Sequence, residues 1–266
     1  FSLIILTNSS ILSQVSINDE NAVLISFDGF NGSGFCPDPA TGQLDSDTWS
    51  VLGLSEGDLN FGDTETEGDF ARGISTGGES TGGCYAFDIG SDNMALGVQP
   101  GGSDWTPGDL ILKVQNNTGN NIVTLSLSYS LWVYNDKPRA NSFNFSHSPD
   151  NSDYTPDSTL NFTSPDTADP SPAWTETVRS MDLNCLNIPN GSNYYLKWTG
   201  DDISGSGSRD EFAIDNITIT ATMGEADSDP PEFIETYPKI SNESNTQFDI
   251  VVQLNEVGHI YYIVIP

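Results

Sequence analysis

Positive charge is what this sequence has least of. Its 266 residues include 8 lysines and arginines against 38 aspartates and glutamates, which gives a formal net charge of −30 at pH 7. Such a field repels phosphate backbones, so we expect this segment to bind no nucleic acid directly. The excess of carboxylates instead suits salty or divalent-rich water, where counterions screen self-repulsion, and it suits oxygen ligation of divalent cations.

Cysteine is also scarce, with Cys36, Cys84 and Cys185 in the whole sequence. Their spacing matches no zinc motif, and an odd number leaves at least one thiol unpaired. Cys84 lies in GGCYAFD, where a small apolar core residue of a strand is expected. Cys36 and Cys185 can form a disulfide if the chain is exported, and the sequence leaves that pairing open.

No hydrophobic run is long enough to span a bilayer. The nearest is the start of the chain, FSLIILTNSSILSQ, which is similar to the back half of a secretion signal with Ser13 ahead of a cleavage site before Gln14. We therefore expect residues 1–13 to be a signal-peptide remnant and the protein to be secreted or held at the cell surface. An ordinary N-terminal strand is the alternative.

Helical periodicity is lacking too, and alternation with a period of two dominates. The odd positions from Val123 to Val133 are apolar, and the even positions from Thr124 to Ser130 are polar, which predicts a long strand with one face in the core. Shorter strands are predicted at Ala22–Phe27, Gly83–Phe87, Met94–Val98, Leu110–Val114, Ser142–Phe145, Tyr194–Trp198 and Phe212–Ile219. Turn-forming clusters of Gly, Asn, Asp, Ser and Pro separate them. This pattern predicts an all-β fold, an antiparallel jelly-roll β-sandwich over residues 21–222.

A second domain is expected after an acidic linker at 223–231, MGEADSDPP. Alternation runs from Phe248 to Leu254, the tetrapeptide NEVG is expected to turn, and HIYYIVIP is predicted to be the partner strand. Residues 232–266 are therefore expected to form an incomplete Ig-like or fibronectin-III-like β domain. Because the edge left open by this hairpin would be unpaired, we expect the chain to be a fragment of a longer protein.

Catalytic signatures are weak. GISTG at 73–77 matches the G-x-S-x-G nucleophile pattern, but no helix follows Ser75 and the sequence has two histidines, His147 and His259. Carboxylates are abundant, yet nothing singles out an acid–base pair for glycoside hydrolysis. We expect this segment not to be an enzyme.

The stretch FAIDNITIT is the best candidate for a metal site. Its apolar phase switches around Asp215, which predicts a β-bulge or an aspartate among apolar neighbours. A buried carboxylate is costly unless it is paired or bound to a metal, and Arg209 is the nearest basic residue in sequence. Asp28, in ISFDGF, ends the first predicted strand. We expect a structural Ca²⁺ held by Asp28 and Asp215, with help from Asp47 or Asp210; the alternative is a solvated acidic rim in which backbone amides cap Asp215.

Aromatic residues suggest a second kind of site. Trp132 and Tyr134 continue the polar face of the long predicted strand, and Trp105 and Tyr195 are candidates to join them. Exposed aromatic patches on a sheet mark contact surfaces, and sugar rings stack on such side chains. Packing in the core or under a loop is the alternative reading of the same residues.

Several segments together resemble a known type of module. They are GQLDSDTW, GDFARG, GGCYAFD, ALGVQPGGSDWTPGD, NDKPRANSFNFS and YYLKWTGDDISGSGSRDEFAIDNITIT. They resemble the jelly-roll-like N-terminal module of secreted bacterial multidomain surface proteins, a type similar to MAM and carbohydrate-binding sandwiches, and the tail resembles the start of an Ig-like repeat. The resemblance covers about residues 21–222 and implies an aspartate in the last strand that helps to hold a cation, a place that Asp215 matches.

The resemblance also implies a role. We expect a non-catalytic extracellular module for adhesion or for binding a glycan or matrix ligand, stabilised by calcium. The alternative is an accessory domain of a secreted multidomain hydrolase, a nuclease or glycosidase, whose catalytic part would lie beyond Pro266.

Overall fold

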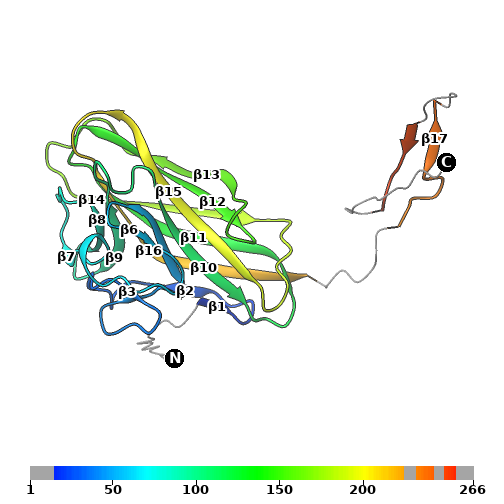
Figure 1. Ribbon diagram of the computed structural model, residues 1–266, viewed down its shortest axis with the longest axis horizontal. Coiled ribbons are helices and arrows are strands. Elements are labelled where there is room, and N and C mark those ends of the chain that lie inside the picture. The colour runs from blue at the N-terminus through cyan, green and yellow to red at the C-terminus, as the bar shows by residue number, and fades with distance from the viewer. Residues whose placement is uncertain (1–14, 225–231, 243–248, 256–266) are drawn as a thin grey trace, which may run out of the picture. The chain divides into compact units, whose positions relative to one another are not determined.

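The computed structural model describes residues 15–224, 232–242 and 249–255 (Figure 1). The chain divides into two compact units, residues 1–225 and 226–266. In the described part, the first unit consists of strands, turns and one short 3₁₀ turn, η1 (Gly68–Phe70). No helix of the described residues is long and apolar enough to cross a membrane.

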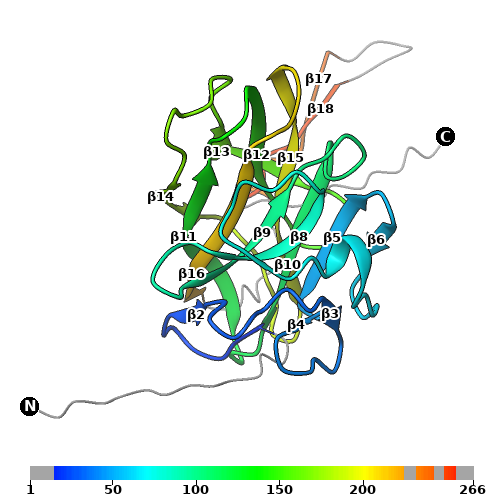
Figure 2. The same cartoon turned by 90° about the vertical axis from the view of Figure 1, so that its left-hand side faces the viewer.

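Two large sheets form the first unit, and Figures 1 and 2 show them as two layers. The first, sheet A, has the order β13 (Thr155–Thr163), β12 (Arg139–Ser148), β15 (Asn193–Gly205), β10 (Gly108–Asn116), β5 (Trp49–Leu54) and β6 (Gly57–Leu59), with β1 (Val15–Ile17) parallel to β10. The second, sheet B, has the order β14 (Trp174–Leu183), β11 (Asn121–Tyr134), β16 (Glu211–Gly224), β9 (Met94–Gln99), β8 (Gly83–Asp88) and β7 (Ile74–Ser75), with β2 (Val23–Ile25) beside β16. A small parallel pair joins β3 (Phe35–Cys36) to β4 (Leu44–Asp45).

The core lies between the two sheets, where the alternation in the sequence places it. Leu125, Leu127, Tyr129 and Leu131 on β11 are buried, while Ser126 and Ser128 between them are partly exposed. The largest fully buried side chains are Trp49, Trp105 and Trp198. Each predicted strand of this unit corresponds to an observed one, so the predicted all-β sandwich is confirmed.

The cysteines do not pair in this structure. Cys84 is fully buried on β8, as predicted, and burial raises the pKa of its thiol to about 12. Cys36 is partly buried and Cys185 is exposed, and both are free.

The remaining expectations fall largely outside the described residues. The segments 1–13, 225–231 and 256–266 belong there, and so does Phe248. β16 continues through Gly224, two residues into the segment expected to be a linker. In the second unit, β17 (Lys239–Ser241) pairs antiparallel with β18 (Asp249–Val251). An Ig-like or fibronectin-III-like domain there stays a prediction.

Candidate functional site

The outer face of sheet A carries a groove of about 240 Å³, called here the sheet A groove. Its lining includes Phe61, Asp109, Ile111, Asn151, Tyr154 and Lys197. These side chains come from β10, from β15 and from two loops, one after β6 and one between β12 and β13.

Strand alternation forms the floor of the groove. On β10, Leu110 and Leu112 point into the core, so Asp109, Ile111 and Lys113 face outward. On the neighbouring β15, Tyr195, Lys197 and Thr199 face outward in the same way. The register sets Lys113 opposite Tyr195, Ile111 opposite Lys197 and Asp109 opposite Thr199, which gives three successive rows.

A tight turn places Tyr154 on one wall. One oxygen of Asp150 accepts hydrogen bonds from the backbone N–H of Ser152 at 2.9 Å and of Asp153 at 3.0 Å, and from Ser148 Oγ at 2.8 Å. These hydrogen bonds hold the pKa of the Asp150 carboxyl well below its usual range. The carboxylate therefore stays ionised within its own turn, and its charge helps to raise the pKa of the neighbouring Tyr154 hydroxyl.

Aromatic rings and two ammonium groups meet in the groove. Lys197 Nζ lies 3.9 Å from the ring centroid of Tyr154, and Lys113 Nζ lies 4.8 Å from that of Phe61. The rings of Phe61 and Tyr195 are 5.7 Å apart. Flat apolar ring faces beside several hydrogen-bonding groups are suited to a ligand that is rich in both C–H faces and hydroxyl groups.

The groove contains a loose ion pair. Lys197 Nζ is 3.5 Å from Asp109 Oδ2, and Thr199 Oγ1 donates to Asp109 Oδ1 at 2.5 Å. Burial, followed by the nearby Asp109 carboxylate, raises the pKa of the Tyr154 hydroxyl above its usual range, so this group stays neutral and donates to Asn151 Oδ1 at 2.6 Å.

The four predicted aromatic ligand residues do not form one surface. Tyr195 faces the groove side of sheet A. Trp105 is instead enclosed in the core, which corrects its expected place on a binding surface. The reason is space: a Cβ at Gly108 or Gly200 would approach the Trp105 ring to about 2.1 or 2.2 Å, so these two glycines make room for the ring between the sheets.

Trp132 and Tyr134 lie on the outer face of sheet B, away from Tyr195. Tyr134 packs against Trp174 with 5.4 Å between ring centroids, and the indole N–H of Trp174 donates to the carbonyl of Thr76 at 3.0 Å. A Cβ at Gly77 would come within 2.8 Å of the Tyr134 ring. The segment around Gly77 therefore packs against the Tyr134 ring, as expected if these aromatic residues pack under a loop. Binding of a ligand by Trp132 and Tyr134 stays a prediction.

A β-bulge stands where the sequence predicts it. The pairing of β11 with β16 shifts from Ser128–Thr218 to Ser130–Asp215, and Asn216 adopts a positive φ of 51°. The bulge turns Asp215 to the outer face of sheet B, where covering residues leave it 1% exposed. The prediction of a bulge is confirmed.

The surroundings of Asp215 include no basic group. Its Oδ2 accepts from Asn216 Nδ2 at 2.9 Å and from Asn93 Nδ2 at 3.2 Å, and its Oδ1 is buried without a hydrogen-bond partner in the described structure. Burial raises the pKa of the carboxyl, and the nearby Asp28 carboxylate raises it further. The backbone amides of Asn216 and Phe27 act in the opposite direction by favouring the charged form.

The other predicted metal ligands divide into two groups. Asp28 is exposed and close enough to Asp215 to raise its pKa, so the structure brings these two together. Asp47 is exposed and lies beside Gly62. Asp210 lies five residues before Asp215 along an extended chain, about 16 Å away at about 3.3 Å per residue, so its expected help at the same ion is wrong. In the described residues, no three or more His, Cys, Asp or Glu are grouped to hold a metal.

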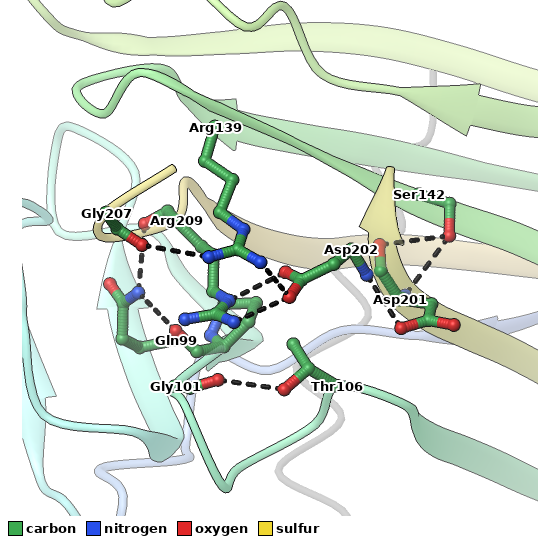
Figure 3. A network of polar contacts seen from close by, with 10 residues as sticks. Gln99, Gly101, Thr106, Arg139, Ser142, Asp201, Asp202, Gly207 and Arg209 are labelled. Atoms are coloured by element: carbon green, nitrogen blue, oxygen red, sulfur yellow. Dashed lines mark hydrogen bonds and ion pairs between the residues drawn. The ribbon is translucent and has the colours of Figure 1, made fainter. Parts of the chain in front are cut away.

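Arg209 has a different partner from Asp215. Its guanidinium donates two hydrogen bonds, of 2.7 and 2.6 Å, to the Asp202 carboxylate, and Arg139 also pairs with Asp202 (Figure 3). Hydrogen bonding to Arg209 lowers the pKa of Asp202. Gln99 Nε2 donates to the Arg209 carbonyl at 3.0 Å, which ties the loop to the end of β9. The charge of Asp202 is thus neutralised by Arg209 of its own hairpin and by Arg139 of β12.

Sequence reasoning missed Glu211 and did not predict the burial of Asp210. Asp210 and Glu211 are fully buried. Burial, assisted by the Asp136 carboxylate, raises the pKa of Glu211 to about 8, and burial raises that of Asp210 to about 6. Glu211 Oε1 accepts the backbone N–H of Glu79 at 2.5 Å. The SRDEF stretch gives no local signal of this burial, because loops from elsewhere in the chain produce it.

Comparisons with known proteins identify no family. No protein-family model and no curated protein matches the chain. Among solved structures, it is similar to the CBM22-1–GH10 modules of a Clostridium thermocellum xylanase (14% identity, TM-score 0.37), covering 76% of this chain but 29% of that one. It is also similar to the CBM22-1 xylan-binding domain of Paenibacillus barcinonensis Xyn10C (11% identity, TM-score 0.37, covering 78% and 99%) and to the K1 cleaved adhesin domain of Lys-gingipain from Porphyromonas gingivalis (17% identity, TM-score 0.37, covering 76% and 99%).

Proposed function

We propose that this chain is a non-catalytic glycan-binding module of an exported protein and that the sheet A groove is its binding site. The proposal rests on the geometry of this groove and not on the similar solved structures, whose sequence identities and TM-scores are low. Tyr154, Phe61 and Tyr195 offer ring faces, while Asp109, Asn151 and Lys197 offer hydrogen-bonding groups beside them. Hydrogen-bonding groups beside aromatic ring faces suit a ligand that has both hydroxyl groups and C–H faces.

The same groove argues for binding rather than hydrolysis. Asp109 is the one carboxylate among the described residues that line it, and it is engaged by Thr199 and Lys197. Glycosidases require a pair of carboxyl groups flanking the scissile bond. Adhesion to a glycan or matrix and targeting of a secreted hydrolase are the two roles that such a module would fit.

Binding to a panel of soluble plant, algal and matrix polysaccharides tests the proposal. Tyr195→Ala and Tyr154→Ala should each weaken binding about 10-fold or more, since each removes a ring worth about 1–3 kcal/mol of contact. Tyr237→Ala, in the second unit, is the matched control and should bind as the parent does. Binding that is unchanged in both groove variants, or no polysaccharide binding at all, would refute the proposed function.

We also propose that Ca²⁺ stabilises the first unit at Asp215 and Asp28. The support is the buried, unpartnered Oδ1 of Asp215 beside a second carboxylate. The eight lysines and arginines of the chain are all described, and none has Asp215 as its salt-bridge partner. Ca²⁺ takes six to eight oxygen ligands, so main-chain carbonyls and water would complete a set begun by two carboxylates.

Thermal unfolding with CaCl₂ and with EDTA tests the ion. Ca²⁺ at about 100 times its Kd should contribute about 2.7 kcal/mol, which raises the Tm by about 5–10 °C. Asp215→Asn and Asp28→Asn should lose this shift, while Asp182→Asn, an exposed aspartate on β14, should keep it. A parent protein with the same Tm in CaCl₂ and EDTA would rule out the ion.

A further inference from the structure

The basic residues are unevenly placed in this acidic molecule. The chain has 38 acidic and 8 basic residues, close to five acids per base. The sheet A groove departs from this excess of acids, since Asp109 is its one lining carboxylate, Lys197 lines it and Lys113 stands over the ring of Phe61 at its edge. Asp150, in the loop between β12 and β13, is hydrogen-bonded into its own turn, and its charge acts on the neighbouring Tyr154.

Lys113 has no anionic partner of its own. Of the seven described lysines and arginines in the first unit, five pair with an aspartate and Arg179 donates to the carbonyls of Thr159 and Asn161. Lys113 makes a contact with the Phe61 ring, at 4.8 Å, and has no carboxylate within ion-pair distance in the described structure. It is partly buried beside Tyr195, so its ammonium group is fixed on the binding face with its donors unused.

Lys197 also keeps unused donors. Its ammonium group is 3.5 Å from Asp109, a long ion pair, and Asp109 is already hydrogen-bonded to Thr199. An ammonium group has three donors, and this contact engages one of them. Lys113 and Lys197 occupy successive rows of the groove floor, so two cationic groups follow one another along the strands.

Building on the proposed function, we infer that the ligand of the sheet A groove is an acidic polysaccharide whose carboxylate or sulfate groups pair with Lys113 and Lys197. Charge-assisted hydrogen bonds to an anion are about twice as strong as those to a neutral hydroxyl, so a partly desolvated ammonium group favours an anionic acceptor. The negative field of the rest of the molecule is screened beyond about 8–10 Å at physiological ionic strength, so the local lysines dominate at the groove.

Matched polymers separate charge from backbone. Isothermal titration calorimetry of the full chain would compare polygalacturonate with its fully methyl-esterified form, and carrageenan with its desulfated form. We expect the charged member of at least one pair to bind about tenfold or more tightly than its neutral partner, with the preference shrinking as salt rises. The two pairs distinguish carboxylate from sulfate as the source of the charge.

Three lysine variants test the site. Lys113→Gln should lose about tenfold in affinity for the acidic polymer, the equivalent of one charge-assisted hydrogen bond, and Lys113→Arg should retain it. Lys197→Gln provides an independent second test at the next row. Lys239→Gln, in the second unit, makes the same change in net charge and should have no effect.

Each result bears on the inference. Equal binding of charged and neutral polymers, or unchanged binding by both Gln variants with folding intact, would overturn the acidic ligand and leave the proposed function standing. Equally tight, Lys113-dependent binding of double-stranded DNA would also overturn it, because the groove would then select charge without a sugar preference. Failure of every polysaccharide to bind would instead remove the proposed function itself.

Discussion

Raising the pH from about 6.5 to 8 should destabilise the first unit, because Glu211 is buried with its proton. Its pKa is raised to about 8 by burial and by Asp136, against 4.5 for an ordinary glutamate. Below pH 4.5 the carboxyl is protonated whether the chain is folded or not, and the stabilisation is fully present. As the pH rises, the unfolded chain releases this proton while the folded chain keeps it, and the stabilisation is lost by the time the pH passes about 8.

The size of the effect follows from linkage. One group that differs in protonation changes the free energy of unfolding by about 1.4 kcal/mol per pH unit, so the loss between pH 6.5 and 8 is about 2 kcal/mol. That corresponds to a fall in Tm of about 4–8 °C for a unit of this size. Asp210 acts in the same direction but below this window, since its pKa is about 6. His147 acts in the opposite direction, with a pKa lowered by burial, and its effect also falls below the window.

Glu211→Gln isolates the responsible group. The amide oxygen of Gln can still accept the N–H of Glu79 but cannot ionise, so the Tm of the variant should change little between pH 6.5 and 8. Glu176→Gln, an exposed glutamate on β14, should keep the slope of the parent. Differential scanning calorimetry across this pH range measures both. A Glu211→Gln variant whose Tm falls as steeply as that of the parent would show that the buried carboxyl is not the source.

Three further outcomes follow from the contacts. Asp202→Asn should cost about 1–3 kcal/mol in urea unfolding, because two arginines lose their shared anion, and a cost no larger than that of Asp201→Asn would contradict this. Arg179→Met should cost about 1 kcal/mol and speed hydrogen exchange in β13, because methionine cannot donate the hydrogen bonds that Arg179 Nη2 makes to two carbonyls of that strand; unchanged exchange would argue against a link between the two edge strands. A thiol reagent should modify Cys185 in the folded protein and Cys84 only on unfolding, as mass spectrometry can show; prompt labelling of Cys84 would contradict its burial.

Most of the strands that carry the core could be predicted from sequence, with β5 as an exception, whereas the edge strands β13 and β14 could not. β11 alternates between polar and apolar residues from Thr124 to Leu131 because one of its faces packs against the other sheet. β13 and β14 stand at the edges of sheets A and B and bury one side chain each, Leu160 and Leu183. Without a row of buried apolar side chains, such strands lack the alternation that pattern reading detects.

The same distinction holds for the candidate site. The bulge at Asp215 is a local event, and the change of apolar phase within β16 is enough to predict it. The groove is not local, since Phe61, Asp109, Tyr154 and Lys197 come from four separate parts of the chain. Tyr195 could be named as a candidate binding residue from the sequence only because it is aromatic. The partner of Arg209 depended on the hairpin geometry that sets Asp202 within reach, which the sequence does not specify.

In a chain with thirty excess negative charges, the positions of the few basic residues say more about which ions and ligands it would bind than the positions of the acids do. Five of them neutralise aspartates of the first unit, and Asp202 alone takes two. Because none pairs with Asp215, that buried carboxyl is neutralised either by its own proton or by a cation from solution. Because Lys113 is held over a ring without a carboxylate in reach, an anion from solution is the matching complement there. The same shortage of positive charge thus motivates the proposed calcium ion on sheet B and the acidic ligand on sheet A.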